Sequence, residues 1–369
     1  MNKLKKAVSS QAFNSFLASL ISIVVGLAFG FVLLLILKAP AALQGMKAML
    51  TTGFSSPDRI AKVLYQAAPL LMCGLSVGFA FKTGLFNIGA PGQYTMGAFF
   101  AIMCATQFQM PWWACLIASM LGGAIWGLFP GLFKALFNVN EVITSIMFNW
   151  IGMYLVNLIF ANTPKALANF WGATNSDRTA DLNKANPGAL IPKLGLDEAF
   201  NSPYMNISIF IAVGLAIVMF IVLQKTTFGY ELKACGMNKN ASRYAGINAN
   251  RNIVLSMVIA GALSGIGGGL YYLAGTGQYV LEKVLLTRGF DGIPVALLAN
   301  SHPLGTILSS LFISYLSVGG SAMQPNFSSE TTNIIIAVII YLAAFSLLMR
   351  TMLAKLSMRR KEKEEEAKQ

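Results

Sequence analysis

Long apolar segments recur along the whole chain and restrict its fold more than any other feature. A helix that crosses a membrane needs ~20 mostly apolar residues, and windows of about that length follow one another here. Only 11% of the residues are charged, whereas charged residues make up about a quarter of a soluble domain. The chain is therefore predicted to be an all-α polytopic membrane protein. The uninterrupted windows are 13–37, 63–81, 88–106, 112–133, 142–160, 205–223, 253–273, 304–321 and 333–349.

A tenth segment, 285–300, is apolar but holds two charged residues, Arg288 and Asp291. It also holds three residues that disturb helices, Gly289, Gly292 and Pro294. We expect a broken or re-entrant helix here, because irregular backbone at membrane depth is tolerated where protein covers it. Counting this segment gives about ten transmembrane helices. Arg288 and Asp291 lie three residues apart and are candidates for a partly buried ion pair.

The distribution of positive charge predicts the orientation. Lysine and arginine prefer the cytoplasmic loops next to the spans. With ten crossings and a cytoplasmic N-terminus, most of the 27 lysine and arginine residues fall inside. We therefore expect a cytoplasmic N-terminus (1–12), a transmembrane domain (13–349) and a charged cytoplasmic tail (350–369). The net charge of +13 then reflects topology and contact with membrane lipid, and no nucleic-acid partner is predicted.

Two long segments between spans differ in character. The segment 161–203 falls outside and is rich in Asn, Pro, Gly and Asp, and a loop of this length is usually functional or disordered. The segment 226–251 falls inside, is basic and contains three glycines. It suits a short amphipathic helix at the membrane surface that is available to a cytoplasmic partner.

Sequence motifs for catalysis and metal binding are missing. The dipeptide Gly-Lys does not occur, so the chain lacks the loop that holds phosphates in P-loop ATPases. The single histidine, His302, precedes a proline in a short turn, and the four cysteines are scattered without a CxxC pair. Metal and disulfide sites are therefore disfavoured. The chain is expected to be no enzyme and to hold no metal.

Polar residues inside a span are rare and carry more information. Glu141, Ser145 and Asn149 follow one another at intervals of four residues and so share one helix face. Such a face either lines a polar path or joins two helices. Glu141 also has a simpler role open to it, because a carboxylate in the first turn complements the helix dipole, with Asn140 as a cap.

The segment 84–93, GLFNIGAPGQ, joins two apolar spans by a hinge that contains Asn87, Gly89, Pro91, Gly92 and Gln93. Its glycines and proline should break helical pairing and free backbone groups. It is either an element of the translocation path or a tightly packed turn.

Glycines at intervals of four residues mark two other spans. Such stripes let a neighbouring helix approach closely in lipid, and they predict tight packing without indicating a function. The two stripes are Gly123, Gly127 and Gly131, and Gly261, Gly265 and Gly269.

Four segments resemble signature stretches of bacterial ABC-importer permeases, in the branch that serves branched amino acids, simple sugars and nucleosides. They are GLFNIGAPGQYTMGAFFA (84–101), NEVITSIMFNWIG (140–152), TTFGYELKACGMNKNASRYAGIN (226–248) and RGFDGIPVALLANSHPLGTILSSLFI (288–313). The resemblance extends from about residue 64 to 349, and it is closest to the larger permease subunit of nucleoside importers.

The resemblance implies a multi-pass protein of the bacterial plasma membrane with three partners. These are a cytoplasmic ABC ATPase that binds ATP and Mg, a second and paralogous permease subunit, and an extracellular substrate-binding lipoprotein. The chain itself would need no cofactor.

In such a permease the segment 226–248 resembles the coupling helix that docks on the ATPase, which implies roles there for Gly229, Glu231, Lys233, Gly236, Asn238, Arg243 and Gly246. Tyr230 and Met237 depart from the family pattern. The residues expected along the substrate path are Phe86, Asn87, Gln93, Glu141, Ser145, Asn149 and Asp291.

Other functions stay open at this point. A simple-sugar importer of the ribose or galactose type would use the same architecture. An ion-coupled secondary transporter would need titratable groups at mid-membrane, where only Asp291 and the edge residue Glu141 are available. A membrane enzyme would need clustered carboxylates, histidines or a nucleophile, and a scaffold would tolerate replacement of the inner segment.

Overall fold

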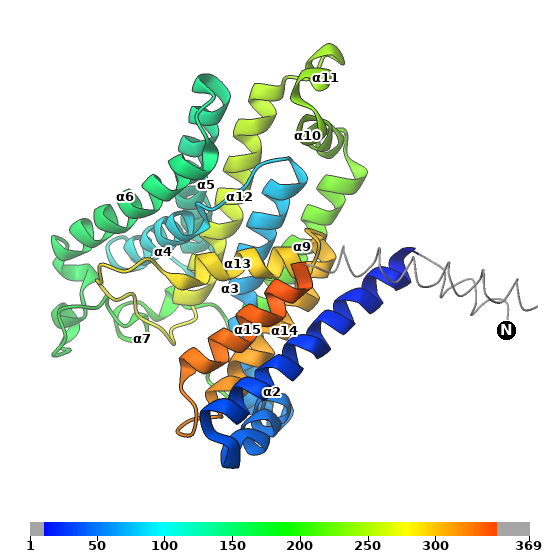
Figure 1. Cartoon of the computed structure of the whole chain (residues 1–369). Coiled ribbons are helices and arrows are strands. Elements are labelled where there is room, and N and C mark those ends of the chain that lie inside the picture. Colours follow the sequence, from blue (N-terminus) through cyan, green and yellow to red (C-terminus); the bar gives the residue numbers. More distant parts are fainter. Residues whose placement is uncertain (1–10, 345–369) are drawn as a thin grey trace, which may run out of the picture. The chain divides into compact units, whose positions relative to one another are not determined.

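The computed structural model describes residues 11–344, which form helices joined by turns (Figure 1). This part of the chain contains no β-strand, and only two isolated β-bridges occur in it. The all-α prediction is confirmed. The predicted N-terminal segment up to residue 10 and the charged tail 350–369 lie outside the described residues.

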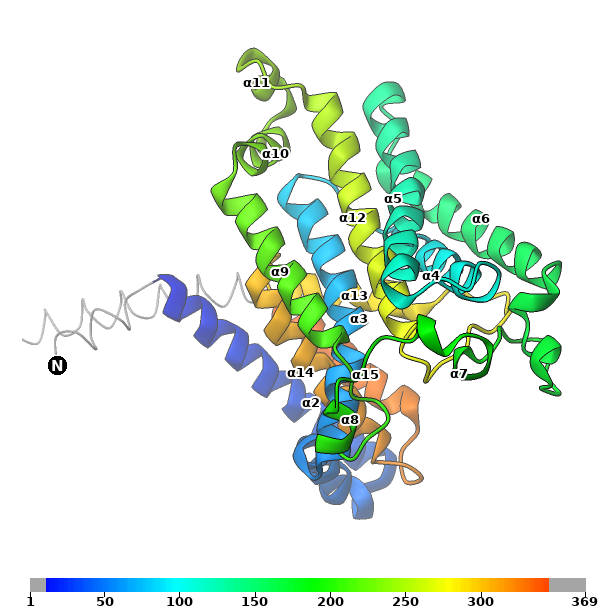
Figure 2. The same cartoon turned by 180° about the vertical axis from the view of Figure 1, so that it is seen from behind.

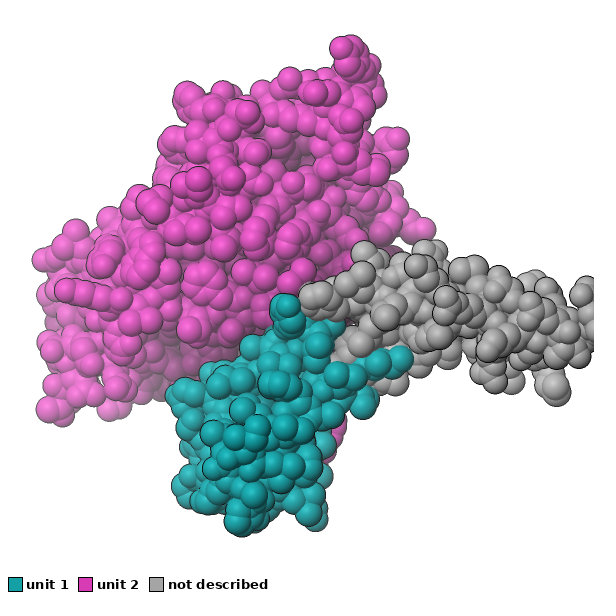
Figure 3. Space-filling model, in the orientation of Figure 1, with its two compact units in different colours: residues 1–52, 316–369 teal, residues 53–315 magenta. Residues whose placement is uncertain are grey.

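The chain divides into two compact units, which Figure 3 distinguishes by colour. The described part of the first unit consists of residues 11–52 and 316–344, and the second consists of residues 53–315.

The first unit is built on α2 (Gln11–Thr51) and α15 (Ser329–Ala344). α2 kinks at Lys38, where the backbone leaves helical geometry close to Pro40, because proline removes one helical hydrogen bond and its ring crowds the preceding turn. The two helices approach at glycines of α2. A Cβ atom added at Gly26 would lie 2.6 Å from Ile339 Cγ1 of α15.

The second unit holds seven of the predicted segments as helices, and an eighth, α14 (Pro303–Ser321), begins in it. Seven helices among the described residues are long and apolar enough to cross a membrane, and α4, α13 and α15 are shorter. The second unit's helices are α3 (Pro57–Lys82), α4 (Ala90–Thr106), α5 (Trp112–Phe137), α6 (Glu141–Ala161), α9 (Ser208–Lys225), α12 (Ala249–Tyr272) and α13 (Thr287–Leu298).

The two predicted glycine stripes face each other across α5 and α12, which confirms the tight packing. A Cβ atom at Gly123 would lie 2.6 Å from the Cα atom of Gly265, and one at Gly265 would lie 2.5 Å from the carbonyl oxygen of Ser119. Backbone therefore packs on backbone here, which only residues without a side chain permit.

The segment 161–203 is an ordered cap at one end of the second unit. Its short helices are η2 (Pro164–Ala166), η3 (Ala168–Trp171), α7 (Leu182–Ala185), η4 (Pro187–Ala189) and α8 (Leu196–Ala199). Asn186 donates hydrogen bonds to the carbonyl oxygens of Ala105 and Met110, and Leu182 and Ile191 are buried. Apolar side chains and polar anchors hold the segment, so the alternative of a disordered loop is wrong.

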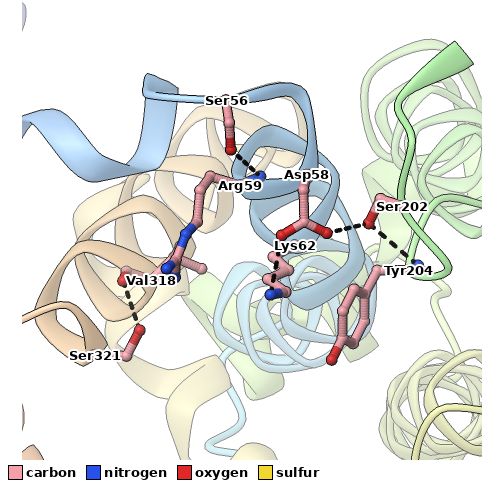
Figure 4. Close-up of polar contacts among 8 residues, drawn as sticks. All are labelled: Ser56, Asp58, Arg59, Lys62, Ser202, Tyr204, Val318 and Ser321. Carbon is pink, nitrogen blue, oxygen red and sulfur yellow. Dashed lines mark hydrogen bonds and ion pairs between the residues drawn. The ribbon is translucent and has the colours of Figure 1, made fainter.

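Polar contacts also fix the end of this cap to the start of α3 (Figure 4). The Ser202 hydroxyl donates to Asp58 Oδ1 at 2.7 Å, and Asp58 forms an ion pair with Lys62 at 3.0 Å. The Lys62 ammonium lies 4.9 Å from the ring centroid of Tyr204.

The segment 226–251 lies at the opposite end of the second unit from α7, as Figures 1 and 2 both show. It forms two short helices where one was predicted, α10 (Thr227–Met237) and α11 (Lys239–Tyr244). Asn238 separates them because its side-chain oxygen accepts hydrogen bonds from the backbone of Asn240 and Ala241, which makes it the N-cap of α11.

Candidate translocation and coupling sites

The hinge between α3 and α4 closes around Asn87. Its side chain is fully buried and donates to Ser76 Oγ at 2.9 Å and to Gln93 Oε1 at 2.8 Å. Its own oxygen accepts from Gln93 Nε2 at 3.0 Å and from the backbone of Gly89 at 3.2 Å. Asn87 therefore uses both its donors and both its acceptor positions inside the protein.

Asn149 of α6 forms hydrogen bonds with the backbone of the hinge. Its oxygen accepts from the backbone nitrogen of Gly92 at 2.9 Å, and its nitrogen donates to the carbonyl oxygen of Ile88 at 3.0 Å. The helix break thus leaves two backbone groups that a side chain on another helix satisfies, as apolar surroundings demand.

Ser145 lies one turn before Asn149 and faces the same hinge. A Cβ atom added at Gly89 would lie 3.1 Å from Ser145 Oγ. This hydroxyl is buried and has no hydrogen-bond partner among the described residues. The structure therefore brings Asn87, Gln93, Ser145 and Asn149 together into one buried polar cluster.

Two other candidates for the substrate path lie apart from this cluster. Glu141 occupies the first turn of α6, where it pairs with Lys134 at 2.9 Å, and Asn140 caps the helix by accepting from Val142 N. Phe86 is half-buried and stacks on Phe81 with ring centroids 5.1 Å apart.

The predicted ion pair on α13 is wrong. Arg288 and Asp291 form no ion pair among those found in residues 11–344. The guanidinium of Arg288 lies over the ring of Tyr271, 4.1 Å from its centroid, while the side chain of Asp291 is exposed. Gly289, between the two charged residues, packs closely on the backbone of Pro91 in α4.

Glycines fix the position of α10 against its neighbours. A Cβ atom at Gly236 would lie 2.7 Å from the backbone nitrogen of Gly84, and one at Gly229 would overlap the carbonyl oxygen of Val222 in α9. Gly84 itself has φ +74°, a conformation that glycine adopts without strain. The predicted coupling segment therefore touches the first residues of the hinge directly.

The polar candidates in this segment hold its own structure. Glu231 accepts from Asn252 Nδ2 at 3.1 Å, and Arg243 donates to Asn250 Oδ1 at 3.1 Å. Gly246 has φ +79°, and Lys233 is half-buried. Partial burial and the neighbouring cations Arg243 and Lys134 lower the pKa of Lys239.

Three large side chains on this surface were not among the predicted docking residues. Tyr230, Met237 and Tyr244 are 68%, 82% and 95% exposed. Tyr230 and Met237 are the residues that depart from the family pattern.

Residues 59–344 match a family model described as branched-chain amino acid transport system / permease component. The chain belongs to this permease family. It is a multi-pass plasma-membrane protein and the permease component of an ABC transport system.

Several curated proteins are similar to the chain over most of its length. The guanosine ABC transporter permease NupP of Bacillus subtilis is 34% identical over 92% of this chain and 96% of its own. The nucleoside ABC transporter permease NupB of Lactococcus lactis is 33% identical over 92% and 93%. The glucose ABC transporter permease TsgB13 of Haloferax volcanii is 29% identical over 83% and 80%. No solved structure matches the chain.

Proposed function

We propose that the chain is the permease subunit of an ATP-driven importer of nucleosides, which a binding protein delivers. The observation that carries the proposal is the similarity to NupP and NupB, which extends over almost the whole of each chain. The identity to the glucose permease is lower and covers less of both chains. A simple-sugar importer is therefore the second candidate.

The proposed topology has ten crossings with both termini in the cytoplasm. α13 is the half-length crossing, since its 12 residues are too few to span the bilayer alone. The placement of α10 and α11 at one end of the second unit and of the 161–203 cap at the other supports this topology. The basic α10 and α11 are then cytoplasmic, and the cap is outside.

The proposed mechanism is alternating access driven by a separate ATPase, which binds ATP and Mg and docks on α10 and α11. A paralogous second permease chain completes the path. Movement of α10 would pass to the hinge through the contact of Gly236 with Gly84. The hinge is bonded to α6 through Asn149, so both elements would respond to the ATPase.

The test is uptake by the complete importer in proteoliposomes. Radiolabelled guanosine should accumulate only with the binding protein outside and ATP on the ATPase side, and an uncoupler should leave the rate unchanged. Uptake that collapses with the uncoupler would support an ion-coupled transporter. Uptake of glucose or ribose without guanosine would support the sugar importer.

A further inference from the structure

A cavity of about 320 Å³ lies in the second unit between the end of α12 and the start of α13. Residues of the loop 278–286 line it, and this loop meets the 161–203 cap through a β-bridge between Arg178 and Val280. Small-molecule sites in proteins begin at about this volume. Its lining includes Tyr271, Gln278, Val280, Glu282, Leu286 and Arg288.

Hydrogen bonds to α6 and to the 161–203 cap fix the loop 278–286. The buried Tyr279 donates its hydroxyl to Asn157 Oδ1 at 2.9 Å, and Asn157 Nδ2 donates to the carbonyl oxygen of Glu282 at 2.8 Å. The backbone nitrogen of Leu281 donates to the carbonyl oxygen of Asp177 at 2.8 Å. These bonds are made within the protein itself and hold the wall of the cavity in place.

Arg288 places a cation at one side of the cavity. The Arg288 guanidinium lies on the Tyr271 ring, and Tyr65 stacks on the same ring at 5.6 Å with an interplanar angle of 30°. Arg288 takes part in none of the ion pairs found among residues 11–344. The ring attracts the guanidinium by a cation–π interaction, and a planar guanidinium also stacks on other aromatic rings and nucleobases.

The remaining groups suit a neutral, planar and polar ligand. Glu282 belongs to none of the ion pairs in the described chain either, so its carboxylate is free to accept two hydrogen bonds. Gln278 adds a donor and an acceptor, and Val280 and Leu286 form an apolar wall. A purine base would stack on the Arg288 plane, as bases do on guanidinium groups, while Glu282 accepts from the base or from the ribose hydroxyls.

We propose that this cavity is the acceptor site for a purine nucleoside at the outer mouth of the permease. The proposal rests on the proposed function and names the residues that first receive the substrate. Arg288 provides the stacking surface, Glu282 the hydrogen-bond acceptor, and Tyr271 holds Arg288 in position.

The experiment uses the complete importer in proteoliposomes with guanosine as substrate and 8-azidoguanosine as photolabel. We expect the label on the peptide 271–288, with protection by guanosine and none by ribose or leucine. Glu282→Gln should raise the KM for guanosine by about tenfold, the size expected for one hydrogen bond to a charged group.

Lys283→Gln is the matched control, because Lys283 adjoins Glu282 but does not line the cavity. Its KM should equal that of wild type. If wild-type importer carries guanosine while Glu282→Gln leaves KM unchanged, or the label lies elsewhere, the acceptor site is refuted and the importer function stands. If ribose or leucine protects as well as guanosine, the assignment to nucleosides is refuted. If wild type carries no guanosine at all, the proposed function itself fails.

Discussion

At the scale of single residues, Asn87 and Asn149 replace the hydrogen bonds that the backbone loses between α3 and α4. Sequence reasoning selected both residues, together with Gln93, for the substrate path. It could not foresee that Asn149 bonds to the backbone of the hinge that contains Asn87, because the two residues are more than fifty positions apart in the sequence. The predicted pairing of Arg288 with Asp291 was wrong for the same reason. Arg288 lies over the ring of Tyr271, which belongs to a different helix, α12.

Asn87→Leu should lower the stability of the protein. It leaves the amide of Gln93 and the backbone of Gly89 buried without their partner, and each unpaired buried group costs ~1–3 kcal/mol. The melting temperature of the detergent-solubilised importer should fall by several degrees. Asn169→Leu, at an exposed position, is the control, and equal melting temperatures for the two variants would contradict the role of Asn87.

Asn149→Leu should lower nucleoside uptake, because it removes the link between α6 and the hinge. The measurement is initial uptake rate at matched protein level in the membrane, with Asn162→Leu as the control. Asn162 lies at the far end of α6 and bonds only to its own helix through its side chain. Unchanged uptake at unchanged expression would count against a role for Asn149 in the path.

At the scale of elements, apolar windows located the long helices of the second unit and α13 but none of its short helices in 161–203 and 226–248, because helix length and lipid contact are properties of a single segment. The windows did not locate the ends of these helices. α3 begins at Pro57, well before its apolar window, since Ser56 caps it and Asp58, paired with Lys62 of the same helix, accepts a hydrogen bond from Ser202 of the 161–203 cap. The fold of that cap depends on anchors to several other elements, which no local pattern reveals.

Gly265→Ala should disrupt the packing of α5 on α12. The new Cβ atom would lie 2.5 Å from the carbonyl oxygen of Ser119, and a backbone atom cannot move aside as a side chain can. The yield of monodisperse protein in size-exclusion chromatography should drop severalfold. Gly214→Ala in α9, where nothing lies within 4 Å of the added atom, should express normally. Equal yields would show that the two helices have room to separate.

Gly236→Pro and Lys233→Glu should uncouple ATP hydrolysis from transport while membrane insertion stays intact. Gly236 meets the hinge backbone, and Lys233 lies on the helix proposed to dock on the ATPase. Uptake per ATP hydrolysed is the measurement, and Gly214→Ala again provides the control. Wild-type uptake in both variants would refute coupling through α10.

At the scale of the whole molecule, the proposed topology places the two ends of the second unit on opposite sides of the membrane. In a chain whose four native cysteines are replaced by serine, Lys193→Cys should react with a membrane-impermeant maleimide in intact cells. Arg243→Cys should react only after permeabilisation. The reverse pattern would invert the topology, and labelling of both from outside would contradict the opposite placement.

The glycine contact between α5 and α12 also bears on how the protein is made. The whole of α6, the 161–203 cap and α9 to α11 separate the two helices in the chain. Since chains fold progressively during synthesis, the glycine surface of α5 can pack on α12 only after α12 has been synthesised. Late insertion of α12 is therefore the step that completes this part of the core.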